Sequence, residues 1–121
     1  MDRIGPYADG FDAGYVEAIG RSAKVSNVFT LDLATGNVFD ITLTANSTIA
    51  LQGRPTKGTV YSFMVIVRLT GGPWTLTGPA AFKYPSAAAP TYSASSVNVI
   101  TAVSVDGGTT FLVSAAGFSY S

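Results

Sequence analysis

The sequence contains no histidine and no cysteine among its 121 residues. Without these residue types the chain cannot form a Ser-His-Asp or Cys-His catalytic group, the usual nitrogen and sulfur ligand set of zinc, or a disulfide. Charge is scarce as well, because only 12% of the residues are charged, about half the usual share for a soluble domain. The zero net charge lacks the cationic surplus of nucleic-acid and anionic-membrane binders, so neither partner is expected.

Long apolar runs are also missing. The longest, residues 63–67, is bracketed by Ser62 and Arg68 and has the length of a strand. The first residues contain no apolar stretch typical of a signal peptide or of a membrane-spanning helix. We therefore expect a soluble protein that is not secreted unless a partner carries it.

The few charges are unevenly distributed along the chain. Residues 1–24 hold half of them, whereas residues 84–121 hold one, Asp106. This distribution predicts a charged N-terminal arm, residues 1–24, followed by a nearly neutral body, residues 25–121. A neutral surface of that extent is easiest to explain if it is buried among subunits.

The arm carries large apolar side chains at intervals of three or four residues: Ile4, Tyr7, Phe11, Tyr15 and Ile19. Four interspersed glycines make a long helix costly, although a short helix from Asp12 to Ile19 is compatible with the pattern. Helical and extended conformations both remain open. The apolar side chains either pack on the chain's own body or dock on a neighbouring subunit.

From Val25 onward the apolar residues alternate with polar ones, which is typical of half-buried strands. Residues 35–37 and 106–108 predict tight hairpin connections, and residues 45–47 predict a second turn after the first hairpin. Residues 61–69 are apolar on both faces and predict a central strand. Seven or eight strands with almost no helix indicate an all-β fold, an antiparallel β-sandwich of jelly-roll type.

Candidate catalytic groups are few. Asp32 and Asp40 flank the first predicted hairpin, and a glycosidase needs two such carboxyl groups about 5–10 Å apart. Both alternate with apolar residues, which favours a solvent-facing position, and Asp106 is interpreted as a turn former. No phosphate-binding loop and no acidic cluster with calcium-ligand spacing occurs. We therefore predict a protein that is not an enzyme, with no cofactor and no metal.

A second set of candidate residues consists of aromatic side chains in or near loops and the C-terminal tail: Trp74, Tyr84, Tyr92, Phe118 and Tyr120. Aromatic rings of this kind either seal a subunit interface or stack on sugar rings. The interface is favoured because the surrounding segment has almost no charge. For Trp74, packing within the domain core is a further alternative.

From Gly36 onward, the order of short motifs resembles a small β-domain that recurs in virion proteins of tailed bacteriophages. The motifs lie at residues 36–44 (Gly-Asn-Val-Phe-Asp-Ile-Thr-Leu-Thr), 47–51, 58–63, 71–76 (Gly-Gly-Pro-Trp-Thr-Leu), 82–85, 89–91 and 106–110. The region that they span, residues 36–110, is about two thirds of the chain. Each motif is common by itself, and their order and spacing carry the resemblance.

The resemblance implies a virion location and a structural role. Such domains usually belong to tail-fibre or receptor-binding proteins and are often trimeric, but this sequence shows only a short arm before the domain. That departure makes it more similar to a capsid decoration, or cement, protein: a homotrimer on the capsid surface that contacts the major capsid protein. The alternative is a tail-fibre or receptor-binding tip that recognises a host surface glycan.

Overall fold

The computed structural model describes residues 19–54, 59–85 and 89–120, and for residues 115–119 the backbone alone. These residues form nine strands and no helix: β1 (Arg21–Val25), β2 (Val28–Asp32), β3 (Val38–Leu43), β4 (Ser47–Gln52), β5 (Tyr61–Leu69), β6 (Leu76–Thr77), β7 (Phe82–Lys83), β8 (Val97–Ser104) and β9 (Phe111–Tyr120). The all-β prediction is confirmed. No helix within the described ranges is long and apolar enough to cross a membrane.

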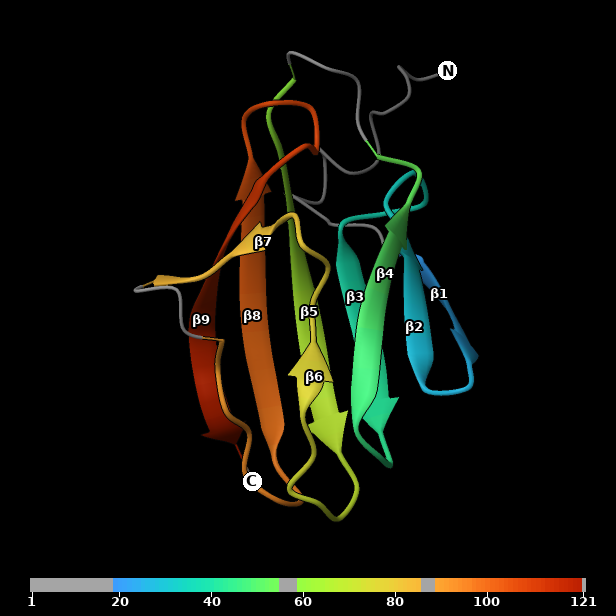
Figure 1. The fold of residues 1–121 in the computed structure, drawn as a ribbon, viewed down its shortest axis with the longest axis vertical. Coiled ribbons are helices and arrows are strands. Elements are labelled where there is room, and N and C mark those ends of the chain that lie inside the picture. The colour runs from blue at the N-terminus through green and yellow to red at the C-terminus, as the bar shows by residue number, and fades with distance from the viewer. Residues whose placement is uncertain (1–18, 55–58, 86–88, 121) are drawn as a thin grey trace, which may run out of the picture.

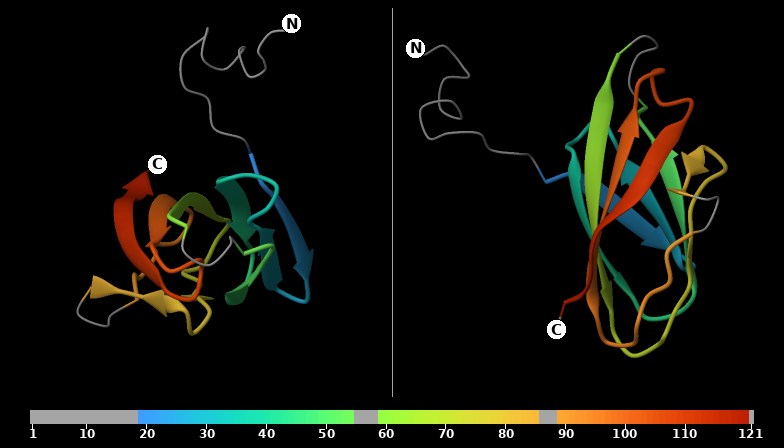
Figure 2. Two further views of the ribbon diagram at one scale, coloured as in Figure 1. Left: turned by 90° about the horizontal axis from the view of Figure 1, so that it is seen from above. Right: turned by 90° about the vertical axis from the view of Figure 1, so that its left-hand side faces the viewer.

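The strands form two mixed sheets. One has four strands in the order β1-β2-β4-β6, and the other has five in the order β3-β5-β8-β9-β7 (Figures 1 and 2). Alternate residues of both sheets enter one shared hydrophobic cluster, in which Leu31 comes from the smaller sheet and Phe39 and Phe111 from the larger. The ring of Phe63 contacts Phe39 edge-on at 5.8 Å and Phe111 at 5.3 Å between centroids. Burial of one apolar face per sheet explains the two-residue period of the sequence.

Between β2 and β6 the chain changes sheet at every strand. As a result, every second strand lies parallel to its predecessor in the same sheet: β4 beside β2, β5 beside β3, and β6 beside β4. Val28 is thus in register with Thr48. This part of the molecule is a two-layered coil, in which each connection arches from one sheet to the other.

The arches correct the sequence prediction. Residues 35–37 and 45–47 do not close hairpins, because β3 lies in the other sheet from both β2 and β4. An arch and a hairpin need the same alternating strands around a polar turn, so the pattern does not distinguish them. Four of the seven strand pairings are parallel, and an antiparallel jelly roll is therefore not confirmed.

Other predicted elements are present. β5 has neighbours on both edges, as its two apolar faces indicated, and β8 and β9 form the hairpin expected around residues 106–108. The sequence reading missed a hairpin between β1 and β2, whose turn residues Ser26 and Asn27 both have positive φ. Since β1 spans Arg21–Val25, the four-stranded sheet takes in residues that had been assigned to the arm.

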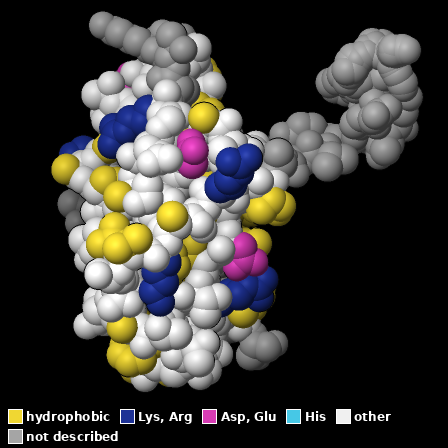
Figure 3. Space-filling view, turned by 90° about the vertical axis from the view of Figure 1, so that its right-hand side faces the viewer, with side chains coloured by type: hydrophobic (Ala, Val, Ile, Leu, Met, Phe, Trp, Pro, Cys, Tyr) yellow, Lys and Arg dark blue, Asp and Glu magenta, His cyan; other side chains and the backbone are white. Residues whose placement is uncertain are grey.

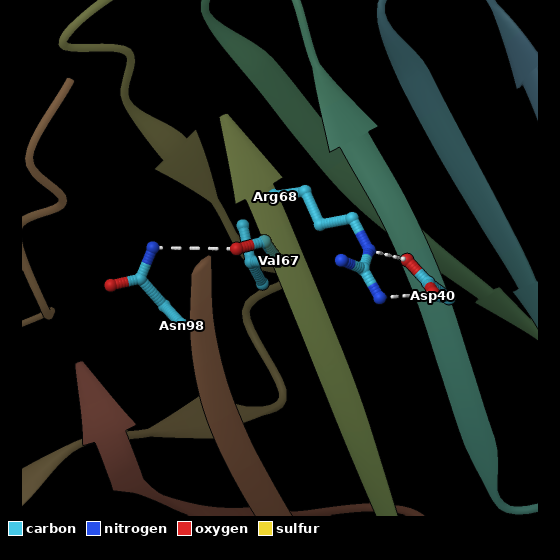
Figure 4. Close-up of polar contacts among 4 residues, drawn as sticks. All are labelled: Asp40, Val67, Arg68 and Asn98. Atoms are coloured by element: carbon cyan, nitrogen blue, oxygen red, sulfur yellow. Dashed lines mark hydrogen bonds and ion pairs between the residues drawn. The ribbon is translucent and has the colours of Figure 1, made fainter. Parts of the chain in front are cut away.

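Two polar side chains tie strands together inside this frame. The Tyr61 hydroxyl lies 3.0 Å from the carbonyl of Leu33 and 2.8 Å from that of Gly36, so its one proton is shared between two carbonyls of the β2–β3 arch. Asn98 of β8 is fully buried, and its Nδ2 donates to the carbonyl of Val67 at 3.3 Å (Figure 4). These bonds connect segments that are far apart in the sequence.

Candidate functional site

The outer face of the five-stranded sheet is the first candidate site. Strand registers place its outward side chains in transverse rows, and two of these rows cross nearly the whole sheet. One row is Ile19, Val38, Met64, Thr101 and Ser114, and the next is Ser62, Val103, Leu112 and Lys83. We call these nine residues the outer-face rows.

Exposed apolar side chains lie within these rows. Ile19 is 70% exposed, Leu112 60% and Val103 38%, and Val38 and Met64 are half-buried between them. Shallow grooves run past Val103 on both sides, one along β5 and the other between β7 and β9. An apolar face of this kind on a monomer is typical of a binding surface.

Charge on this face is nearly absent. Toward the other end of the sheet, Arg68 donates to both carboxylate oxygens of Asp40 at 2.9 and 3.1 Å, so the two side chains neutralise each other (Figure 4). The Asp40 carboxylate raises the pKa of Arg68, first through the hydrogen bond and then through its charge. Among the nine residues of the outer-face rows, Lys83 is the one that carries a charge. By contrast, the side of the molecule that carries β1 shows basic and acidic side chains interspersed (Figure 3).

The second candidate site is an apolar cavity of about 640 Å³ beside β6. Trp74, Tyr84 and Tyr92, three of the five aromatic residues singled out above, line it together with Leu76 and Pro90. The Trp74 indole Nε1 donates to the Thr70 carbonyl at 2.9 Å, which fixes the ring at the cavity wall. The structure thus brings together residues that lie up to 18 positions apart in the sequence.

Burial sets the electrostatics of this cavity. Tyr92 is 7% exposed and belongs to the core cluster, and Tyr84 packs against that cluster. Burial raises the pKa of both phenols, and for Tyr92 the neighbouring Tyr84 raises the pKa further. No charged side chain lines the cavity among the described residues. The site therefore suits a neutral ligand with an apolar ring face.

The other candidate residues lie elsewhere or cannot be placed. Tyr120 is 55% exposed at the end of β9, in register with Val97, and does not line the cavity. Phe118 lies in the same strand, in the stretch described by its backbone alone. In the arm, Ile19 is exposed beside Val38. The other four arm residues lie outside the described residues: Ile4, Tyr7, Phe11 and Tyr15. The same holds for the predicted helix apart from Ile19.

The carboxylate pair considered for a glycosidase is not formed by a hairpin. Asp32 ends β2 in the four-stranded sheet, where its Oδ1 accepts a hydrogen bond from the Ala34 amide at 3.1 Å. Asp40 lies in the five-stranded sheet and is paired with Arg68. Within the described ranges no group of three or more acidic, histidine or cysteine residues is suited to hold a metal ion.

Sequence reasoning identified the aromatic residues of the cavity but missed the outer face. The apolar residues Met64 and Ile66, which indicate that β5 is a central strand, also point to the outer face. The same alternation places Val99 and Val103 of β8 on that face. Apolar residues at the outward positions of two neighbouring strands were the available signal. No known family model, curated protein or solved structure matches the chain.

Proposed function

We propose that this protein is a non-enzymatic structural protein of a tailed-phage virion, a capsid decoration protein that binds the assembled shell as an oligomer. The observation that carries the proposal is the outer face of the five-stranded sheet, which presents apolar and hydroxyl side chains and, apart from Lys83 and the Asp40–Arg68 pair, no charge among the described residues. The sequence resemblance directs the proposal to the virion.

The size of this face is sufficient for a specific contact. The strands β3, β5, β8, β9 and β7 contain 6, 9, 8, 10 and 2 residues, and at about 3.3 by 4.8 Å per residue they cover roughly 550 Å². A standard interface buries about 800 Å² per partner, so the face and its rim supply most of the area required. A protein that binds only the assembled shell stabilises it by RT ln(1 + [L]/Kd) per site.

The test is binding of the purified protein to capsids that lack it, measured by co-sedimentation, together with its location in a virion reconstruction. Val103→Lys with Leu112→Lys places two charges in the contact, and we expect shell affinity to fall at least about tenfold, the effect of 1.4 kcal/mol. Val25→Lys is the matched control, because Val25 is 71% exposed on β1 of the other sheet. Unchanged binding by the double variant, or density on the tail alone, contradicts the proposal.

The aromatic cavity favours a second candidate function, recognition of a host surface glycan. Trp74 and Tyr84 are half-buried at one uncharged cavity whose wall also includes the buried Tyr92, and aromatic side chains in such a place suit stacking on a neutral sugar ring. Against it, neither a carboxylate nor a side-chain amide is among the residues that line the cavity in the described part of the chain.

Titration of the protein with host polysaccharide, followed by NMR, tests this candidate. Trp74→Ala and Tyr84→Ala are each expected to weaken binding about two- to twelvefold, as the loss of an aromatic contact worth about 0.5–1.5 kcal/mol predicts. Tyr120→Ala is the control, because Tyr120 lies away from the cavity. Absence of binding at millimolar sugar rejects this function.

A further inference from the structure

The chain enters the described body at the edge of the apolar outer face. β3 is an edge strand of the five-stranded sheet, and beyond it Ile19 forms a parallel bridge with Val38. The Gly20 amide donates to the Val38 carbonyl at 2.7 Å, which fixes this point of entry. Ile19 therefore begins one of the outer-face rows, and residues 1–18 precede it.

The length of that preceding segment matches the width of the sheet. The row from Ile19 to Ser114 crosses four interstrand steps of about 4.8 Å, a distance of about 19 Å. Extended chain advances about 3.3 Å per residue, so the six residues from Ile19 back to Ala13 cover about 20 Å. In that conformation Phe11, Tyr15 and Ile19 point to the same side, because their positions differ by even numbers.

Charge also makes the two parts complementary. Residues 1–18 contain four acidic side chains and one basic one, whereas the rest of the chain contains three acidic and six basic ones. One of these cations, Lys83, lies at the far side of the outer face, in register with Leu112. The seven residues from Ile19 back to Asp12 cover about 23 Å, close to the five interstrand steps of about 4.8 Å that reach β7. Asp12 itself is an odd number of positions from Ile19 and in an extended arm points to the opposite side from Tyr15, so the attraction between the arm and Lys83 comes from the net negative charge of residues 1–18 and not from a direct ion pair.

We propose that residues 1–18 pack across the outer face of their own five-stranded sheet, with Tyr15 on its apolar rows, Phe11 at its far edge beside β7 and the acidic arm drawn towards Lys83. The arm then covers this face in the free protein and competes with any partner that binds there. The inference goes beyond the virion role, since it concerns the isolated protein and requires no shell.

Disulfide trapping tests this placement in the full-length chain, which has no cysteine of its own. Ala13→Cys is combined with Ser114→Cys, an exposed position on the outer face, and oxidation is followed by non-reducing electrophoresis and peptide mass mapping. The control pairs Ala13→Cys with Thr48→Cys, which is exposed in β4 of the other sheet. If the arm were only a flexible tether, its cysteine would meet a cysteine on the body at a millimolar effective concentration. The control pair measures how fast a disulfide forms under that condition.

We expect the disulfide within one chain to form at least about tenfold faster in the Ser114 pair than in the control pair, well above the rate of a free tether. When Lys83→Glu is added to the Ser114 pair, the disulfide should form severalfold more slowly. Lys24→Glu in β1 is the charge control and should leave the rate unchanged. Thr101→Cys, in the same row, replaces Ser114→Cys if that variant does not fold. Equal rates for the two pairs, or disulfides formed only between chains, overturn the proposal. If the protein does not bind the shell but the Ser114 pair still forms its disulfide rapidly, the virion role is rejected and the placement of the arm stands.

Discussion

Asn98 is a fully buried amide in a strand whose other core-facing residues include Ile100 and Ala102. Its Nδ2 donates to the Val67 carbonyl of β5 and, at 3.0 Å, to the Ser96 hydroxyl. A buried polar group contributes to stability only while its hydrogen bonds are made, and removing one partner leaves the other unsatisfied. Asn98 therefore fixes how β8 meets β5 at the start of the strand.

We expect Asn98→Ala to lower the free energy of unfolding by about 2 kcal/mol, because the carbonyl and the hydroxyl lose their donor in a buried site. Urea denaturation followed by tryptophan fluorescence measures the change. Asn46→Ala is the control: Asn46 is exposed, and its Oδ1 accepts one bond from the Thr75 amide, so a loss of at most about 1 kcal/mol is expected. Equal losses in the two variants would show that burial of Asn98 has no special weight.

At the scale of the element, the arches between the sheets depend on side chains that hold their backbone. The Tyr61 hydroxyl reaches two carbonyls of the β2–β3 arch, Leu33 and Gly36. Removing it in Tyr61→Phe should cost about 1 kcal/mol of folding free energy, measured by thermal or urea unfolding. Tyr120→Phe removes a hydroxyl from an exposed residue at the end of β9 and should cost nothing measurable. A neutral Tyr61→Phe substitution contradicts the anchoring role.

The carboxylate of Asp106 accepts hydrogen bonds within the turn of the β8–β9 hairpin. Hydrogen bonds from the Thr110 amide at 3.0 Å and from the Ser104 hydroxyl at 2.8 Å hold the pKa of Asp106 below its ordinary value of 3.8. A lowered folded-state pKa stabilises the protein above the unfolded-state value, and this contribution is lost as the pH falls through the folded-state pKa.

Asp106→Asn should therefore be less stable than the natural chain at pH 6, and the difference should shrink as the pH falls below about 4. Unfolding free energies of both proteins between pH 2 and 6 measure this. Subtraction at each pH cancels the titration of the other carboxyl groups, and a gap that stays constant with pH would exclude the charge of Asp106 as its cause.

The elements also show how far the sequence carries the fold. Alternation located the strand residues of β2, β3, β5, β8 and β9, because each buries one face or both. The alternation does not tell which strands pair with each other, because a turn such as residues 35–37 permits either a hairpin or an arch. The arch was selected by contacts distant in the sequence, for example β2 with β4 and Tyr61 with Gly36. The aromatic cavity had a local signal, whereas the outer face appears only when several registers are known.

For the whole molecule, low charge raises the question of what keeps an apolar sheet face in water. The isolated protein has no net charge, so repulsion between copies is weak. If the arm covers this face, Tyr7→Ser, Phe11→Ser and Tyr15→Ser together should uncover it. The expected result is a severalfold rise in fluorescence of a dye that binds exposed apolar surface, with an unchanged cooperative unfolding transition.

A second set of substitutions tests whether the dye binds to the outer face itself. Adding Val103→Lys and Leu112→Lys to the triple arm variant should return dye binding to the level of the natural chain, because the uncovered surface is then charged. Val25→Lys and Val60→Lys, which charge two exposed valines outside the outer-face rows, should leave the dye signal high. If both pairs of lysines lower the signal equally, the dye reports general surface hydrophobicity and the arm does not protect one particular face. If neither pair lowers it, the arm covers a different part of the molecule.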